Sequence, residues 1–211
     1  MRDIPMFTTE NGVASLCLGN VAYTKTAYIY IRDTQVPEAF LKECFDFCRS
    51  VGAESVYATG HSYLSMYEQA VSVLEMQCDS LTDNTVANLI PVQDNTLEEW
   101  RSIYNAKMAN VPNAAYITYH GAKKYLQEGN CYFVYKENKM IGVGVVGDHK
   151  IDAVASVCRG GGKDVVLALC KYLNGVPVTL RVADSNSKAI QLYHSLGFEV
   201  CSVAERWYKI I

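Results

Sequence analysis

The sequence predicts an α/β (α+β) fold in which helices flank a sheet, and three observations carry this prediction. Apolar runs of strand length alternate with segments of helical periodicity over residues 85–211. Residues 130–136 and 139–146 are two such runs on either side of Glu137-Asn138, which is typical of an antiparallel hairpin. Half of the 211 residues are hydrophobic and 19% are charged, so the composition is that of a globular protein.

Charge and hydropathy exclude several classes of function. A formal net charge of −3 provides no basic footprint for nucleic acid, so we expect no nucleic-acid partner. The N-terminus, MRDIPMFTTENG, lacks the apolar core of a signal peptide, and no run approaches about 20 consecutive apolar residues. We therefore expect a cytoplasmic protein without a membrane partner.

The eight cysteines form no recognisable metal or disulfide pattern. None belongs to a C-x-x-C pair. Cys44 and Cys48 could share one helix face, but no histidine or second pair nearby completes a zinc set. We expect buried free thiols and no metal site.

From residue 85 onward, the predicted elements alternate between strands and helices. Strands are predicted at 85–92, 130–136, 139–146, 150–158 and 176–183, and in the two C-terminal runs EVCSV and RWYKII. Helices are predicted at 96–109, at 119–129, from the glycine run to Asn174-Gly175, and from Asn186 to a C-cap at Gly197. Thr96 and Glu99 have the spacing of a capping box.

Residues 1–84 are expected to form a smaller α/β lobe. Strands are predicted at 13–18, 27–32 and 54–59, and helices at 37–52 and 62–71. When Tyr67 is aligned with Tyr193, Leu41 coincides with Leu167, which indicates a diverged internal repeat. The alternative is that two strand-helix-strand-helix units share only the apolar periodicity that such units need.

The stretch SVCRGGGKDVVLALC places three glycines between a strand and a helix. It fails the Walker A pattern, because Val157 stands where a glycine is needed and Asp164 where Ser or Thr is needed. It fails the dinucleotide pattern G-x-G-x-x-G at Val165. What remains is Arg159-x-x-Gly162 at a helix start, where free N–H groups and the helix dipole can face an anion. The alternative is a glycine-rich turn without a ligand.

The segment DSNSKAIQLYHSLGF, one strand further on, favours the anion site. With it, the chain resembles the GNAT superfamily of acyl-CoA-dependent N-acetyltransferases, whose signature joins R/Q-x-x-G-x-G/A to N-x-x-A-x-x-L-Y-x-x-x-G-F. The matching residues are Arg159, Gly162, Asn186, Ala189, Leu192, Tyr193, Gly197 and Phe198. The resemblance covers residues 85–211 and implies a mixed, mostly antiparallel sheet flanked by helices, with residues 1–84 as a degenerate GNAT-like half. Asp164 departs from the signature. Its carboxylate would weaken CoA binding if it faces the pyrophosphate, and would have little effect if it caps the helix and faces away.

The resemblance implies acetyl-CoA as co-substrate and assigns residues to it. Backbone amides would hold the pyrophosphate at Gly160, Gly161, Gly162, Lys163, Asp164 and Val165, with the charge of Arg159 nearby. Main-chain groups would meet the pantetheine arm at Ala155, Ser156 and Val157, and Asn186 would contact the cofactor arm. Lys163 has the alternative of pointing into solvent.

The resemblance also implies a catalytic role for Tyr193. Its hydroxyl would lie near the thioester sulfur and donate a hydrogen bond or proton, while a strand N–H would stabilise the oxyanion. The alternative for Tyr193 is packing alone. The attacking amine must lose a proton, and Asp152, on the strand before the loop, is the candidate base by position, with His149 just outside that strand. A lone aspartate there can equally be a solvated strand residue.

The prediction is an N-acyltransferase that transfers an acetyl group from acetyl-CoA to a primary amine on a small molecule or peptide. The acceptor pocket is expected within residues 97–129, which carry no pattern that selects an acceptor. The alternative is a non-catalytic acyl-CoA-binding sensor or interaction protein. A third hypothesis is that the N-terminal lobe is an interaction surface that pairs two chains into a homodimer or covers the acceptor site.

Overall fold

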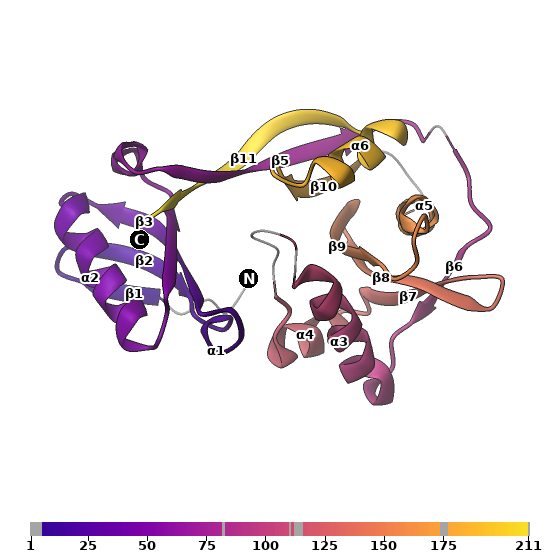
Figure 1. Cartoon of the computed structure of the whole chain (residues 1–211), viewed down its shortest axis with the longest axis horizontal. Coiled ribbons are helices and arrows are strands. Elements are labelled where there is room, and N and C mark those ends of the chain that lie inside the picture. The colour runs from indigo at the N-terminus through magenta and orange to yellow at the C-terminus, as the bar shows by residue number, and fades with distance from the viewer. Residues whose placement is uncertain (1–5, 82, 110, 112–115, 174–176, 211) are drawn as a thin grey trace. The chain divides into compact units, whose positions relative to one another are not determined.

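Figure 1 shows the computed structural model of the chain, which describes residues 6–81, 83–109, 111, 116–173 and 177–210. The chain forms two compact units, one made of Met1–Ser72 with Glu205–Ile211 and the other of Val73–Ala204. The boundary predicted between residues 84 and 85 falls inside the second unit. No helix in the described ranges is both long and apolar enough to span a membrane.

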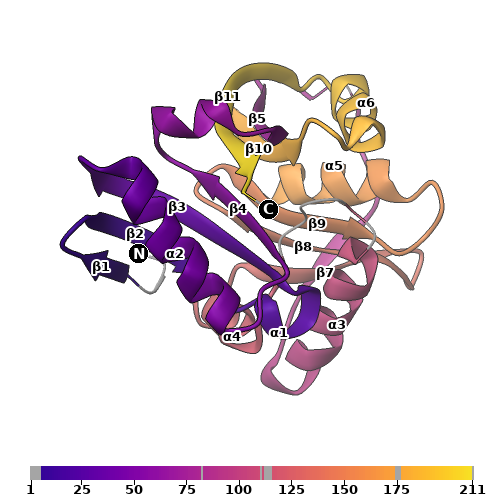
Figure 2. The same ribbon diagram turned by 60° about the vertical axis from the view of Figure 1, so that its left-hand side comes forward.

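The first unit is a mixed sheet with one long helix packed on it. Its elements are β1 (Met6–Thr9), β2 (Gly12–Cys17), α1 (Val21–Thr24), β3 (Thr26–Thr34), α2 (Pro37–Ser50), β4 (Ser55–Thr59) and the 3₁₀ helix η1 (Ser62–Met66). β1, β2 and β3 are antiparallel neighbours, and β4 pairs with β3 in parallel. α2 lies across the strands (Figure 2) and buries Phe40, Leu41, Cys44 and Cys48 against them.

The second unit is a larger mixed sheet with helices on both faces. Its strands are β6 (Asn88–Pro91), β7 (Cys131–Lys136), β8 (Lys139–Gly147), β9 (Lys150–Ser156) and β10 (Val178–Ala183), and its helices are η2 (Asp94–Thr96), α3 (Leu97–Met108), α4 (Tyr119–Gln127), α5 (Gly162–Tyr172) and α6 (Ser187–Ser195). α3 and α4 share one apolar cluster with Val143 and Val145, whereas α5 and the end of α6 share another with Val146 and Ile151. The two faces of the sheet are therefore both buried.

Two strands, β5 (Gln69–Cys78) and β11 (Glu199–Lys209), are exchanged between the halves of the sequence. In the second unit, β5 pairs antiparallel with β10 and lies between β10 and β11. In the first unit, the last residues of β11 pair antiparallel with β4. Each unit therefore completes its sheet with a strand from the other half.

The order and pairing of elements repeat along the chain. The series β1-β2-β3-α2-β4-β5 corresponds to β7-β8-β9-α5-β10-β11, with the same strand directions in the first four strands of each. The aligned Leu41 and Leu167 are both buried, on α2 and α5 respectively. The predicted internal repeat is therefore present in the fold. Within the described residues, the first half has no counterpart of α3 and α4.

Alternating glycine and valine on β8 bring α5 close to the sheet. A Cβ at Gly142 would lie 2.5 Å from Val165, and a Cβ at Gly144 would lie 2.7 Å from Leu169. The side chains of Val143 and Val145 belong to the apolar cluster on the opposite face, with α3 and α4. The strand thus presents backbone to α5 and side chains to α3 and α4, which fixes α5 directly over β8 and β9.

Several local predictions are confirmed. Glu137 and Asn138 both have positive φ, as a tight hairpin turn between β7 and β8 requires. All eight cysteines are free, and five of them are buried: Cys44, Cys48, Cys78, Cys131 and Cys170. Cys201 is exposed, so the expectation of burial is wrong there.

Other local predictions are wrong, because tertiary contacts override the local pattern. The helix predicted at 62–71 is only the 3₁₀ helix η1, and β5 begins at Gln69, where β11 is its neighbour in the sheet and the Lys209 N–H donates to the Glu68 carbonyl at 3.0 Å. The two predicted C-terminal strands are one strand, β11. The capping box joins Gln93 to Thr96, not Thr96 to Glu99.

Two strand boundaries also differ from the prediction. The strand predicted at 85–92 is shortened to β6, and the one predicted at 150–158 ends at Ser156. The helix end predicted at Asn174-Gly175, and the first residue of the strand predicted at 176–183, lie outside the described residues.

Gly60, at the end of β4, allows a close approach of the backbone to Ile31 of β3, and this approach can be tested. Its φ is +98°, and a Cβ there would overlap the Ile31 carbonyl oxygen. Gly52 has a similar φ of +93°, but a Cβ there would meet only Val21, at 4.0 Å. We expect Gly60→Ala to lower the free energy of unfolding of the first unit by about 3 kcal/mol or more, and Gly52→Ala by only about 1 kcal/mol.

Urea unfolding followed by tryptophan fluorescence measures this difference. The chain has two tryptophans, and Trp207 belongs to the first unit. A Trp100→Phe background therefore makes Trp207 the single reporter. Equal losses for the two alanine variants would contradict the close approach of β4 to β3.

Candidate functional site

β9 and β10 pair at one end only and then separate. Residues Lys150–Ile151 pair with Thr179–Leu180, and no further pairs follow although both strands continue. Residues 153–156 of β9 and residues 181–183 of β10 therefore form no backbone hydrogen bonds with each other. We call this unpaired interval the wedge. Ligands of α/β sheets commonly bind at such carboxyl ends of parallel strands.

An extra residue in β9 accounts for the separation. Against β8, Val145 pairs with Ala153 and Val146 with Ile151, so Asp152 is a bulged residue without a partner. A bulge bends a strand and increases its local twist. Because Asp152 directly follows the last pair with β10, the bulge turns β9 away from β10 where their pairing stops.

The wedge edge of β9 presents main-chain groups of alternate residues. The Val157 N–H donates to the Ile141 carbonyl at 2.9 Å. Since antiparallel pairing alternates, Ala155 also faces β8, whereas Val154 and Ser156 direct their N–H and C=O groups into the wedge. Of the residues predicted to meet the pantetheine arm, only Ser156 directs its main-chain groups into the wedge, as does Val154, whereas the main-chain groups of Ala155 and Val157 point toward β8.

The glycine loop brings free N–H groups to the start of α5. Gly161 precedes α5 without a capping side chain, and in the described part of the chain the N–H groups of Gly162, Lys163 and Asp164 have no acceptor. The Val165 N–H donates to the Gly161 carbonyl at 3.0 Å, and the Gly161 N–H is used in the preceding turn. Four of the six amides predicted for a pyrophosphate are therefore available, and those of Gly161 and Val165 are not.

The structure also explains why each of the three positions in the loop is a glycine. Gly160 has a φ of +81°, in the left-handed region, with open space around it. A Cβ at Gly161 would lie 3.1 Å from the Ser156 hydroxyl oxygen, and one at Gly162 would lie 3.1 Å from Leu192. The glycines thus let the loop pack closely against the end of β9 and against α6.

The side chains of Asp164 and Lys163 have partners outside the glycine loop. The Asp164 carboxylate accepts a hydrogen bond from the Thr85 hydroxyl at 2.6 Å and pairs with Lys136 at 2.9 Å. These contacts, the Thr85 hydrogen bond first, hold the pKa of Asp164 below its ordinary value. Lys163 pairs with Asp83 at 2.7 Å. The Asp164 carboxylate is therefore bound to Thr85 and Lys136, and its effect on CoA binding stays a prediction.

Tyr193 lies on the inward side of α6 and is 6% exposed. Its ring centroid is 5.9 Å from that of Phe198, and burial, followed by the nearby Cys170, raises the pKa of Tyr193 to about 12. The phenol is therefore protonated at neutral pH. The Asn186 side chain accepts from the Ala189 N–H at 3.2 Å, so it caps α6.

The remaining predicted residues lie around the wedge and loop. Arg159 is exposed and has no ion-pair partner among the described residues. Asp152 pairs with Lys150 at 3.1 Å. His149 lies in the turn before β9, with a φ of +59°. Part of the predicted acceptor region, residues 97–129, falls outside the described residues.

The first unit lacks a wedge at the equivalent place. Every residue of β4 pairs with β3, from Ser55 to Thr59. The bulge of β3 is at Arg32, beyond the last of these pairs, so it does not separate the strands. The helix that follows β3 begins with Pro37 in place of glycines. The two halves therefore share a scaffold but differ at the site.

No protein-family model and no curated protein matches the sequence. Solved structures do match it over most of its length. A GNAT-family acetyltransferase from Colwellia psychrerythraea is 14% identical, with a TM-score of 0.54 over 97% of this chain and 83% of that one. A GCN5-related N-acetyltransferase from Sphaerobacter thermophilus is 10% identical, with a TM-score of 0.56 over 93% and 75%. The fold is that of the GNAT acetyltransferases.

A third similar structure bears on the first half of the chain. A tandem GNAT protein from the clavulanic acid biosynthesis pathway is 13% identical, with a TM-score of 0.55 over 94% of this chain and 78% of that one. The GNAT fold predicted for residues 85–211 is thus confirmed, and the likeness extends over both halves.

Three residues of the site are not found by sequence reasoning. Val154 is in KIDAVAS, which reads as a regular strand, and only the pairing with β8 shows which N–H groups face the wedge. Thr85 and Lys136 are far from Asp164 in the sequence and carry no motif. In the described residues, no group of three or more His, Cys, Asp or Glu side chains could hold a metal ion.

The Asp164 contacts predict a pH-dependent contribution to stability. Because its folded pKa is lowered, the contribution is present above the pKa of an unfolded aspartate, about 3.9, and is lost as the pH falls through the folded value. We expect Asp164→Asn to lower the free energy of unfolding by about 1 kcal/mol at about pH 7 and by much less at about pH 2. Urea unfolding in a Trp207→Phe background, in which Trp100 is the single fluorescent reporter, measures both free energies.

Asp94→Asn is the matched control. Asp94 pairs with Lys123 in the same unit, but its side chain is 81% exposed, so its removal should cost less than about 0.5 kcal/mol. A loss for Asp164→Asn that is the same at both pH values would contradict the argument.

Proposed function

We propose that the protein is an N-acyltransferase that moves an acetyl group from acetyl-CoA to a primary amine. One observation carries the proposal: an unpaired strand edge and an uncapped helix start meet at the C-terminal end of β9. A pantetheine arm would add to the edge as an extra strand does, through Val154 and Ser156. A pyrophosphate would accept hydrogen bonds from the first turn of α5.

The residues present fit this ligand. Gly160 leaves open space beside the loop, and Arg159 offers a positive charge that has no ion-pair partner in the described part of the chain. Lys163 and Asp164 are held by Asp83 and Thr85, so their side chains would leave their N–H groups accessible. Asn186 would contribute mainly as the cap that orients α6.

Acetyl-CoA would supply the activated thioester, and side chains would handle the protons. Tyr193, kept protonated by burial, would donate to the departing sulfur. A wedge N–H, from Val154 or Ser156, would stabilise the charge that develops on the carbonyl oxygen. Asp152 would accept the proton of the amine, from its bulged position beside the wedge, once released from Lys150.

A charge placed in the loop tests the proposed anion site. Gly160→Asp introduces a carboxylate where nothing lies within 4 Å of the new Cβ. Gly160→Asn has the same shape without the charge, and both residue types tolerate positive φ. We expect Gly160→Asp to weaken acetyl-CoA binding by about tenfold or more relative to Gly160→Asn. Isothermal titration calorimetry measures both, and the absence of binding to the unsubstituted protein at about 1 mM ligand would overturn the proposal.

Tyr193→Phe tests the chemistry separately from binding. We expect kcat to fall by about 10²-fold, towards the lower end of positioned-acid effects, with the affinity for acetyl-CoA unchanged. Because the pKa of Tyr193 is about 12, its ionisation should not shape the profile of activity between about pH 7 and about pH 10. Steady-state rates with a panel of primary amines measure this.

The outcomes separate the alternatives. Full turnover in Tyr193→Phe would leave this residue a packing role only. Acetyl-CoA binding without acetyl transfer to any amine would favour the sensor, for which the ion pair that holds Asp152 is the motivating observation.

A further inference from the structure

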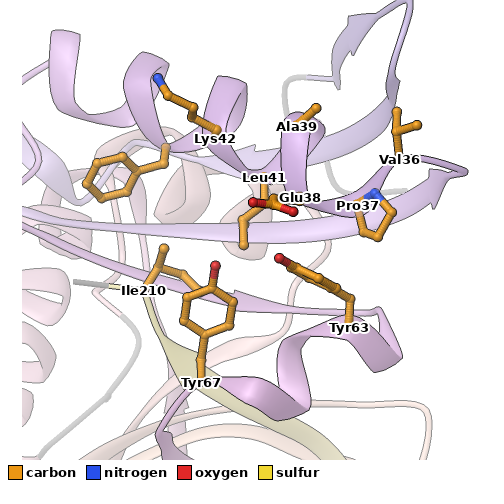
Figure 3. A pocket seen from close by; sticks show the side chains of 10 residues that line it. Val36, Pro37, Glu38, Ala39, Leu41, Lys42, Tyr63, Tyr67 and Ile210 are labelled. Carbon is orange, nitrogen blue, oxygen red and sulfur yellow. The ribbon is translucent and has the colours of Figure 1, made fainter.

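The first unit contains a cavity of about 780 Å³ between the start of α2 and the segment around η1. This volume is within the usual range for small-molecule sites. Figure 3 shows the two walls: α2 on one side, and Tyr63 and Tyr67 on the other, with both hydroxyls directed toward α2. Leu41, Phe45 and Ile210 make the lining largely apolar. Every lining residue belongs to the first unit.

The internal repeat relates this cavity to the candidate site of the second unit. Tyr67 aligns with Tyr193, and the start of α2 corresponds to the start of α5. The features that would hold a pyrophosphate are replaced, however. Pro37 is the first residue of α2 and has no N–H, and Glu38 places a carboxylate in the first turn. The first unit therefore has a cavity at this place, and the helix start beside it carries a carboxylate instead of free N–H groups.

Glu38 is the charged group available to a ligand. It has no ion pair among the described residues. The other charged lining residue, Lys42, is bound to Asp46 at 2.6 Å, and its amine points away from the tyrosines in Figure 3. Local burial first, then the proximity of Glu38 and Tyr67, raises the pKa of Tyr63, which agrees with hydroxyls close to the carboxylate.

We infer that this cavity binds a small organic cation, namely a protonated amine on an aromatic or aliphatic body. The ammonium group would pair with Glu38 and lie against the rings of Tyr63 and Tyr67, which attract cations through their faces. The body would cover Leu41, Phe45 and Ile210. This site is distinct from the proposed acetyl-CoA site and does not depend on the transferase activity.

Three probes with one body and different charge test the inference. They are 2-phenylethylamine, 2-phenylethanol and 3-phenylpropionate, titrated to about 10 mM into the full chain because ligands of this size bind weakly. Two-dimensional amide NMR follows the resonances of residues 38–45 and 63–67. We expect saturable shifts with the amine, at least about tenfold weaker binding of the alcohol, and no binding of the anion.

Glu38→Gln should reduce the affinity for the amine to that for the alcohol, whereas Glu54→Gln should leave it unchanged. Glu54 is exposed, in the same unit, and does not line the cavity, so it makes the same change of charge elsewhere. Equal binding of amine and alcohol, preference for the anion, or unchanged amine affinity in Glu38→Gln would each overturn the inference. Shifts of the same resonances by acetyl-CoA would also overturn it, because they would assign the cavity to the cofactor.

Discussion

Asp152 has no partner across β8, and β9 leaves β10 at that residue. Everything proposed for the second unit depends on this bulge. If β9 and β10 paired as β3 and β4 do, the main-chain groups of Val154 and Ser156 would be used by the sheet. The start of α5 would still have free N–H groups, but no extended ligand could lie beside the strand that leads to them. The bulge leaves part of one strand edge of the sheet free to bind an extended ligand.

The two halves show how little has to change to alter what one scaffold can bind. A bulge placed beyond the paired region, at Arg32, leaves the strands of the first unit joined. A proline and a glutamate at the helix start replace glycines, so that the end of the helix favours a positive rather than a negative group. The packing of α2 and α5 on their sheets is conserved through this change, because their buried stripes correspond.

Much of the fold was predictable from local pattern, because the segments of α2 to α6 carry apolar residues at helical spacing and β7 and β8 flank a clear turn. The loop and α6 were predictable from a motif. The wedge was not, since KIDAVAS alternates like any strand and a bulge appears only in its register with β8. The partners of Asp164 were not, because Thr85 and Lys136 reach it through tertiary contacts. The start of β5 was predicted as part of a helix because SYLSMYEQAV has helical spacing, but β11, which is distant in sequence, is its neighbour in the sheet.

The exchange of β5 and β11 has a consequence for biosynthesis. The strand that completes the sheet of the first unit, beside β4, consists of nearly the last residues of the chain. Domains usually fold from the N-terminus as they emerge during synthesis. Here the N-terminal sheet must wait, with one edge of β4 open, until the residues from Glu205 onward have been synthesised and have left the ribosome. During that interval the open edge is a template for pairing with other nascent chains, and the short length of β4 limits this risk.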